Sequence, residues 1–274
     1  MKKSLRVLLG ACALVGFSAA SHATIVTDWS ATITGAWTGS TFSSDANEHT
    51  SSTVLSWGHS TGDGQSSLTI SNPPANENVT TYIGGGTPPS GDIAASNSIT
   101  HDNNPVTGGS LTGATFTDTI ILKALNPLGA GPALSPFSFN IAFLETPNVA
   151  GQCPAASPPN NPCNDIFVLL GGFPNFDFDY LGQTYFVNVF PTSGGVLSVL
   201  SNSACAAVNA VNSGAPATGC FGFTTQEGAA TTLAFGFTVS TLPLSNNVPE
   251  PGTIALFGLA LLGLAVTRRR TWMR

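Results

Sequence analysis

Apolar and polar residues alternate with a period of two along much of the chain, and this pattern constrains the fold most strongly. The run 137–143 reads FSFNIAF, the run 233–239 reads LAFGFTV, and the run 176–180 reads FDFDY. Such alternation predicts strands with one buried face. Further strands are expected at residues 25–37, 53–57, 67–70, 115–125, 166–170, 185–190, 196–200 and 220–225.

These segments amount to about ten strands, with turn-rich loops between them. The segment 181–183, Leu-Gly-Gln, is expected to turn one strand into the next. No convincing helix is predicted between the two ends of the chain, because good helix formers such as Lys and Glu are scarce there. The pattern therefore predicts an all-β protein, an antiparallel β-sandwich of jelly-roll-like kind.

The first 23 residues have the features of a secretory signal peptide. Lys2, Lys3 and Arg6 precede an apolar run from Leu8, and Ser21-His22-Ala23 has the small-x-small form of a cleavage site. Cleavage is predicted after Ala23. The chain is therefore expected to be exported.

The last 27 residues form a second unusual segment. Pro249-Glu250-Pro251 is followed by an apolar stretch over 252–266 and then by Arg268, Arg269 and Arg270. The stretch is shorter than the roughly 20 residues that a stable membrane span needs. The arginines place the C-terminus in the cytoplasm. A single-span tail anchor is one interpretation.

The order of these three parts resembles a PEP-CTERM sorting signal. This resemblance implies processing by exosortase, a membrane transpeptidase-like enzyme, with removal of the tail near Pro249. It also implies a Gram-negative bacterium that makes exopolysaccharide. The chain would pass through the inner membrane, be held there transiently by its tail, and then reach the cell surface or the extracellular space. The expected layout is a signal peptide at 1–23, a sandwich domain at 24–247 and a sorting signal at 248–274.

Removing both ends changes the charge of the chain. Residues 24–247 contain one basic residue, Lys123, and thirteen Asp and Glu residues, so their net charge is about −12. This balance excludes a basic nucleic-acid-binding protein. It favours cations or neutral polar partners such as glycans.

Four cysteines remain in the exported part, which predicts two disulfides. Three pairings are possible. We favour Cys153–Cys163 and Cys205–Cys220, because each pair brackets a loop rich in Pro, Gly or Asn. A zinc site is the alternative, but spacings of ten and fifteen do not suit it.

The segment Thr100-His101-Asp102-Asn103 lies between Ile99 and the turn formers Asn104-Pro105. A turn in which His101 makes a structural hydrogen bond is the favoured interpretation. The alternative is a ligand contact or a catalytic histidine. With Trp57-Gly58 and the segments 164–169 and 219–227, this motif resembles the THxN family of PEP-CTERM proteins. The resemblance implies an exported β-rich protein with Thr100, His101 and Asn103 as the family motif, and it supplies no catalytic residues.

Asp177 and Asp179 alternate along one expected strand, and Asp165 lies upstream. Their carboxylates are weak candidates for a calcium site. A solvated outer face is the favoured interpretation, so no metal or other cofactor is expected, with calcium left possible.

These features together predict a non-catalytic protein of the cell surface or extracellular matrix, associated with exopolysaccharide in a biofilm. Contact is expected through exposed Trp, Tyr, Thr and Asn side chains. The alternatives are a calcium-dependent carbohydrate-binding module or adhesin, and a glycan-active hydrolase, which needs two converging carboxyl groups.

Overall fold

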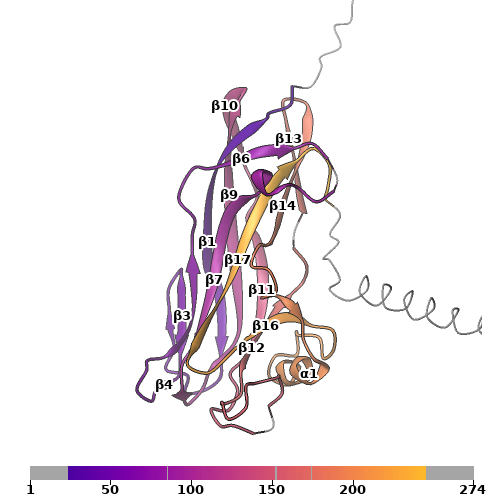
Figure 1. Ribbon diagram of the computed structural model, residues 1–274. Coiled ribbons are helices and arrows are strands. Elements are labelled where there is room, and N and C mark those ends of the chain that lie inside the picture. Colours follow the sequence, from indigo (N-terminus) through magenta and orange to yellow (C-terminus); the bar gives the residue numbers. More distant parts are fainter. Residues whose placement is uncertain (1–23, 85, 152, 174, 245–274) are drawn as a thin grey trace, which may run out of the picture.

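Two long antiparallel strands, β1 (Asp28–Phe42) and β9 (Leu111–Asn126), lie side by side along the whole length of the protein (Figure 1). The structure, a computed structural model, describes residues 24–84, 86–151, 153–173 and 175–244. The predicted signal peptide at 1–23 and the sorting signal at 248–274 lie outside these residues. Along β1 the side chains alternate between the core and the surface, as the period-two pattern predicts.

One continuous sheet contains fifteen of the strands and bends into two layers. The first layer continues outward from β1 and β9. Its other strands are β11 (Phe137–Leu144), β12 (Asp165–Leu170), β16 (Phe221–Thr225) and β15 (Ser198–Val199), with β10 (Leu128–Ala133) added on β9.

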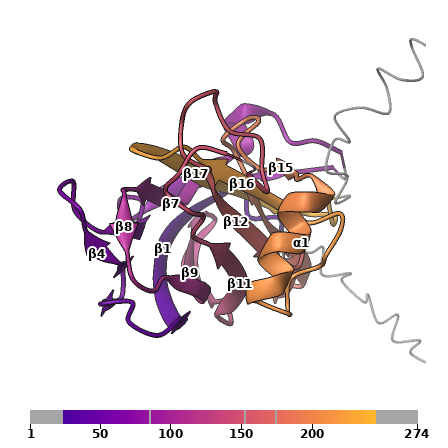
Figure 2. The ribbon, with the colours of Figure 1, turned by 90° about the horizontal axis from the view of Figure 1, so that it is seen from below.

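The second layer is built around β17 (Ala229–Ser240), and Figure 2 shows it facing the first layer. Its other strands are β6 (Glu77–Tyr82), β7 (Ala94–Asn103), β5 (Ser66–Ser71), β3 (Val54–Trp57), β2 (His49–Thr50), β14 (Gln183–Pro191) and β13 (Asn175–Tyr180). A separate small ribbon pairs β4 (His59–Ser60) with β8 (Val106–Thr107), and a 3-10 turn, η1, spans Ser90–Asp92.

The space between the layers is filled by large apolar side chains. Phe139 of the first layer stacks on Phe235 of the second, with ring centroids 6.1 Å apart. Trp29, buried completely, meets Tyr185 edge-on at 5.2 Å. The predicted all-β sandwich is confirmed. Aromatic and aliphatic burial between the layers is the main source of its stability.

The sheet is mixed rather than purely antiparallel, because β6 and β17 run parallel where the layers join. Two strands lie where the sequence indicated loops. β6 falls in the Pro- and Gly-rich region that follows Ser71, and β7 contains the Thr100–Asn103 motif. Both carry polar residues at buried positions, such as Thr81 in β6 and His101 and Asn103 in β7, and these hide the alternation.

A helix, α1 (Asn202–Val211), corrects the prediction that the domain has none. Ser201 caps it by accepting a hydrogen bond from the Ala204 backbone N–H at 3.2 Å. Ala204, Cys205 and Val208 pack against the outer face of β11 and β12. The segment contains four alanines, the best helix former, and packing against the sheet supplies the rest of the stability.

Candidate functional site

His101 points into the core at one end of the sandwich. It lies on β7, where Ile99, His101 and Asn103 face inward while Thr100 and Asp102 do not. The His101 ring stacks on Trp57 with centroids 5.9 Å apart and meets Phe143 edge-on at 4.9 Å. His101 is therefore a core residue of a strand, and the expectation that it lies in a turn is wrong.

Three carboxyl groups lie at the same end of the sandwich as this histidine, and that of Asp165 is beside its ring. Asp165 begins β12, Glu145 follows directly after β11, and Glu227 lies in the turn between β16 and β17. The register pairs Leu144 with Ile166, so Glu145 and Asp165 lie opposite each other at the same end of neighbouring strands. We call His101, Glu145, Asp165 and Glu227 the acid cluster.

Hydrogen bonds hold two of these carboxyl groups in place. The Trp57 indole N–H donates to Glu145 Oε2 at 2.6 Å. The Thr146 backbone N–H donates to Asp165 Oδ1 at 2.8 Å, and its hydroxyl donates to the same oxygen at 3.2 Å. Glu145 and Asp165 are therefore held at the ends of β11 and β12, whereas Glu227 lies in a turn.

Burial sets the protonation of the acid cluster. It raises the pKa of Glu145 to about 7 and the pKa of Asp165 well above its usual value, and the charge of Glu145 raises the latter further. It also raises the pKa of Glu227 and lowers the pKa of His101 to about 3. The nearby charge of Glu227 adds to the rise in both pKa values. Burial therefore favours the protonated form of Glu145 and of Asp165.

Several polar atoms of the acid cluster have no hydrogen-bond partner among the described residues. They include both ring nitrogens of His101, Asp165 Oδ2 and both carboxyl oxygens of Glu227. His101 Nε2 lies 3.7 Å from Asp165 Oδ2, too far for a hydrogen bond. The hydrogen bond expected of His101 is therefore not made, and the ring is held by its aromatic neighbours.

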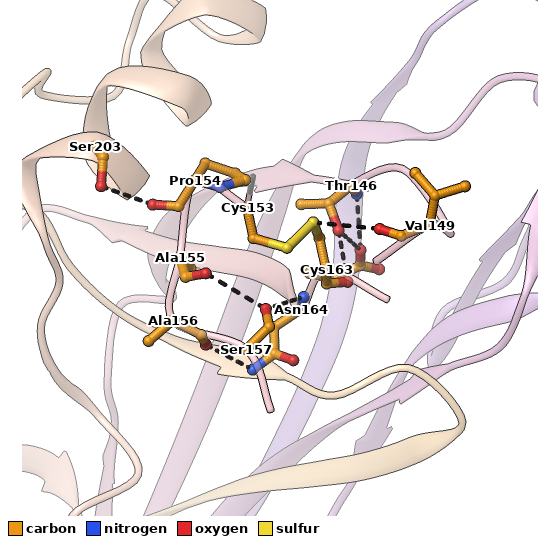
Figure 3. Close-up of a disulfide and its surroundings, with 11 residues drawn as sticks. Thr146, Val149, Cys153, Pro154, Ala155, Ala156, Ser157, Cys163, Asn164 and Ser203 are labelled. Carbon is orange, nitrogen blue, oxygen red and sulfur yellow. Dashed lines mark hydrogen bonds between the residues drawn. A yellow bond between two sulfur atoms is a disulfide. The ribbon is translucent and has the colours of Figure 1, made fainter. Parts of the chain in front are cut away.

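The first disulfide fastens the loop between β11 and β12, as Figure 3 shows. Cys153 and Cys163 are bonded, and the Thr146 hydroxyl donates to the Cys163 carbonyl at 2.7 Å. Ser203, in the first turn of α1, donates to the Pro154 carbonyl at 2.7 Å. The second disulfide, Cys205–Cys220, ties α1 to the start of β16. Both predicted pairings are confirmed.

The THxN motif residues have separate structural roles. Thr100 faces outward, where its hydroxyl lies 2.8 Å from the Thr232 hydroxyl on β17. The Asn103 side-chain amide is buried and donates to the Thr225 carbonyl at 3.1 Å, which links β7 to β16. Only His101 of the three belongs to the acid cluster.

The structure does not bring the three calcium candidates together. Asp165 is buried in the acid cluster, while Asp177 and Asp179 are exposed on β13, which belongs to a different hairpin. Among the residues that the structure describes, no three His, Cys, Asp or Glu side chains are arranged to hold a metal ion. Glu145 and Glu227 were not singled out from the sequence. The position of Glu145, directly after an alternating strand, was the available signal.

The outer face of the first layer has a different character. The Thr117 hydroxyl lies 2.7 Å from the hydroxyls of both Thr38 and Ser138, and Thr115 donates to Asn140 Oδ1 at 3.0 Å. We call these five side chains, from β1, β9 and β11, the hydroxyl face. A hollow of about 390 Å³ borders it, lined in part by Thr115, Asn140 and Asn212. None of the residues lining this hollow is charged.

Residues 247–270 match the PEP-CTERM protein-sorting motif. The chain is a protein with a PEP-CTERM sorting signal. Pro249, Glu250, Pro251, Arg268, Arg269 and Arg270 all fall inside the match. The motif indicates an exported protein that is processed by exosortase and held at the membrane before release to the surface.

No curated protein matches the chain. In the part of the chain that the structure describes, which stops at residue 244, no helix is both long and apolar enough to span a bilayer. The family match therefore covers the sorting signal and not the sandwich.

Replacing His101 with alanine is expected to lower the free energy of unfolding by about 2–4 kcal/mol, because a cavity opens between Trp57 and Phe143. The neighbouring change Asp102→Ala, at an outward position, is the matched control and is expected to stay within about 0.5 kcal/mol of the wild type. Urea unfolding of the exported domain measures both. Equal stability of the two variants would contradict the packing role of His101.

The raised pKa values of the buried carboxyl groups predict that stability falls as the pH rises. Burial also raises the pKa of Asp118 to about 7. Between about pH 4 and 7 the unfolded chain therefore loses protons that four carboxyl groups keep in the folded state, namely those of Asp118, Glu145, Asp165 and Glu227. His101 acts in the opposite direction, because its pKa is lowered. The four carboxyl groups outweigh His101, so the free energy of unfolding falls as the pH rises. The melting temperature is therefore expected to be higher at pH 5 than at pH 8.

The variant Glu145→Gln isolates one of these contributions, since its amide oxygen still accepts from Trp57. Between pH 5 and pH 8 the free energy of unfolding of this variant is expected to fall by about 2 kcal/mol less than that of the wild type. Asp179→Asn, on exposed β13, is the control and should leave the pH profile unchanged. Thermal melts of the wild type and both variants at pH 5 and pH 8 measure this difference. The same pH dependence in the wild type and in Glu145→Gln would contradict the contribution assigned to Glu145.

Proposed function

We propose that the exported domain is a non-catalytic protein of the cell surface or extracellular matrix that associates with exopolysaccharide in a biofilm. The observation that carries the proposal is the hydroxyl face, an uncharged array of hydroxyl and amide groups on three adjacent strands. Glycan hydroxyls exchange hydrogen bonds readily with such groups. A domain of net charge about −12 gains no attraction for a neutral glycan, so hydrogen bonds must provide the contact.

The route of contact differs from the sequence-based expectation. Trp29, Trp37 and Trp57 are buried in the core, as is Tyr185, so the expected exposed tryptophan surface is absent from the described residues. The proposal therefore rests on Thr, Ser and Asn side chains rather than on aromatic stacking.

The acid cluster supports the non-catalytic part of the proposal. A hydrolase needs two carboxyl groups beside a space that admits a sugar. Asp165 is fully buried, and neither the hollow beside the hydroxyl face nor the one in the 150–161 loop is lined by Glu145 or Asp165. The proposed function requires no cofactor. Calcium enters only as an ion that could bridge the acidic domain to an anionic polymer.

Removing two hydroxyls from the hydroxyl face tests the proposal. The double variant Thr115→Val/Thr117→Val keeps the β-branched shape and is expected to weaken binding to the exopolysaccharide of the native host roughly ten-fold. Thr100→Val/Thr232→Val, a hydroxyl pair on the second layer, is the matched control. Affinity electrophoresis of the secreted protein in gels containing the polysaccharide measures both. Equal losses, or binding that survives in the first variant, would contradict the proposal.

A further inference from the structure

Exposed apolar side chains gather at the end of the sandwich where β1 begins and β17 ends. They come from separate strand ends and turns rather than from one segment. The set comprises Ile25, Ile83, Leu125, Leu128, Leu181 and Leu242, with exposed fractions from 36% to 76%. We call this set the apolar end.

The strand pairings place these residues at one end. β1 begins there opposite the last residue of β9, since Asp28 pairs with Asn126. β6 and β17 run parallel and finish together, and the Thr241 N–H donates to the Tyr82 carbonyl at 3.0 Å, between Ile83 and Leu242. The β13–β14 turn joins them, because Tyr180 packs on Trp29 of β1.

Leu181 occupies an unusual position in this set. It stands at the tip of the β13–β14 turn with a φ of 51°, a left-handed conformation that Gly, Asn and Asp adopt far more readily than leucine. Half of its surface is exposed. A large apolar residue that stays half exposed in such a conformation points to a contact made outside the domain.

The length of the chain beyond the sandwich limits where this end can lie. The last described residue is Leu244, and the apolar stretch of the sorting signal begins at Gly252. Seven intervening residues span at most about 25 Å when fully extended. While the tail is held in the membrane, the apolar end therefore stays within that distance of the bilayer, whose polar interface is itself several ångströms deep.

The one lysine of the exported domain lies beside this end, and three exposed acids lie far from it. Lys123, the cation of the exported domain, lies exposed on β9 between Ile121 and Leu125, beside the apolar end. The exposed acids Asp45, Glu48 and Asp63 lie at the opposite end, beyond the far end of β1 and beside β4. A strand of the length of β9 covers about 50 Å. This distance far exceeds the screening length of about 8 Å, so an anionic surface at the apolar end does not repel those acids.

We propose that the apolar end is a membrane-docking surface, which rests on the bilayer while the sorting signal is still attached. Several acids lie toward this end, among them Asp28, Asp92, Asp177 and Asp179, and two of them are hydrogen-bonded within the domain. Asp28 accepts from the Thr27 hydroxyl at 2.6 Å, and Asp179 accepts from the Thr184 hydroxyl at 2.6 Å. Docking of this kind orients the domain upright on its tail, with the acid cluster directed away from the lipid. The proposal rests on the sorting signal and does not depend on binding to exopolysaccharide.

Photolabelling from lipid tests the proposal with the full-length chain. The precursor is reconstituted in vesicles of phosphatidylethanolamine and phosphatidylglycerol that contain a photoactivatable phospholipid, and labelled peptides are mapped by mass spectrometry. Peptides containing Leu128 and Leu181 are expected to carry about ten-fold more label than peptides containing Val149 and Val199, which are equally exposed apolar residues at other sites.

The double variant Leu128→Ser/Leu181→Asn is expected to lose most of the labelling around Ile83 and Leu242. Asparagine suits the left-handed conformation at position 181, so the fold is retained, and a thermal melt verifies this. Val149→Ser/Val199→Ser is the control and should leave the labelling unchanged. Equal labelling of all four apolar sites, labelling confined to residues 252–266, or cross-links between two copies in place of lipid adducts would each overturn the proposal.

Discussion

Thirteen carboxyl groups and one lysine share the exported domain, and this imbalance governs how charge is handled throughout the structure. A carboxyl group that enters the core has no cation to pair with, so it must accept hydrogen bonds or keep its proton. Glu145 and Asp165 do both, because they accept hydrogen bonds from Trp57 and Thr146 and burial raises their pKa values. Lys123 lies exposed on β9 and is not part of the acid cluster.

The same imbalance separates the domain into regions of different chemistry. Aromatic and aliphatic side chains hold the two layers together, as in the contact between Phe139 and Phe235. The hydroxyl face remains free of charge, while exposed acids lie at both ends of the sandwich, with Asp45, Glu48 and Asp63 at one end and Asp179 at the other. The disulfide Cys153–Cys163 fastens the loop that borders the acid cluster, where ion pairs are not available to do so. The proposed membrane docking, the proposed glycan contact and the stability thus depend on different parts of one sandwich.

The sequence predicted the strands that alternate strictly, such as 137–143, and both disulfide pairings. It did not predict α1, because Lys and Glu are scarce in this segment. The helix forms on its Ser201 cap and its alanines instead. His101 was assigned to a turn on the strength of its Asn and Pro neighbours, while the pairing of β7 with β17 extends the strand to Asn103. The acid cluster depends on which strand ends meet, and that follows from the register of β11 and β12 rather than from any local pattern.

The central claim is that the buried carboxyl groups keep their protons in the folded state. Proton exchange on unfolding, followed with a pH electrode in weakly buffered solution near pH 6, tests it most directly. The folded domain holds protons on Asp118, Glu145 and Asp165 that the unfolded chain gives up, and this exceeds the single proton that His101 gains. A net release of protons on unfolding is therefore predicted. A net uptake, or no exchange, would mean that these carboxyl groups are ionised in the folded protein and would contradict the account.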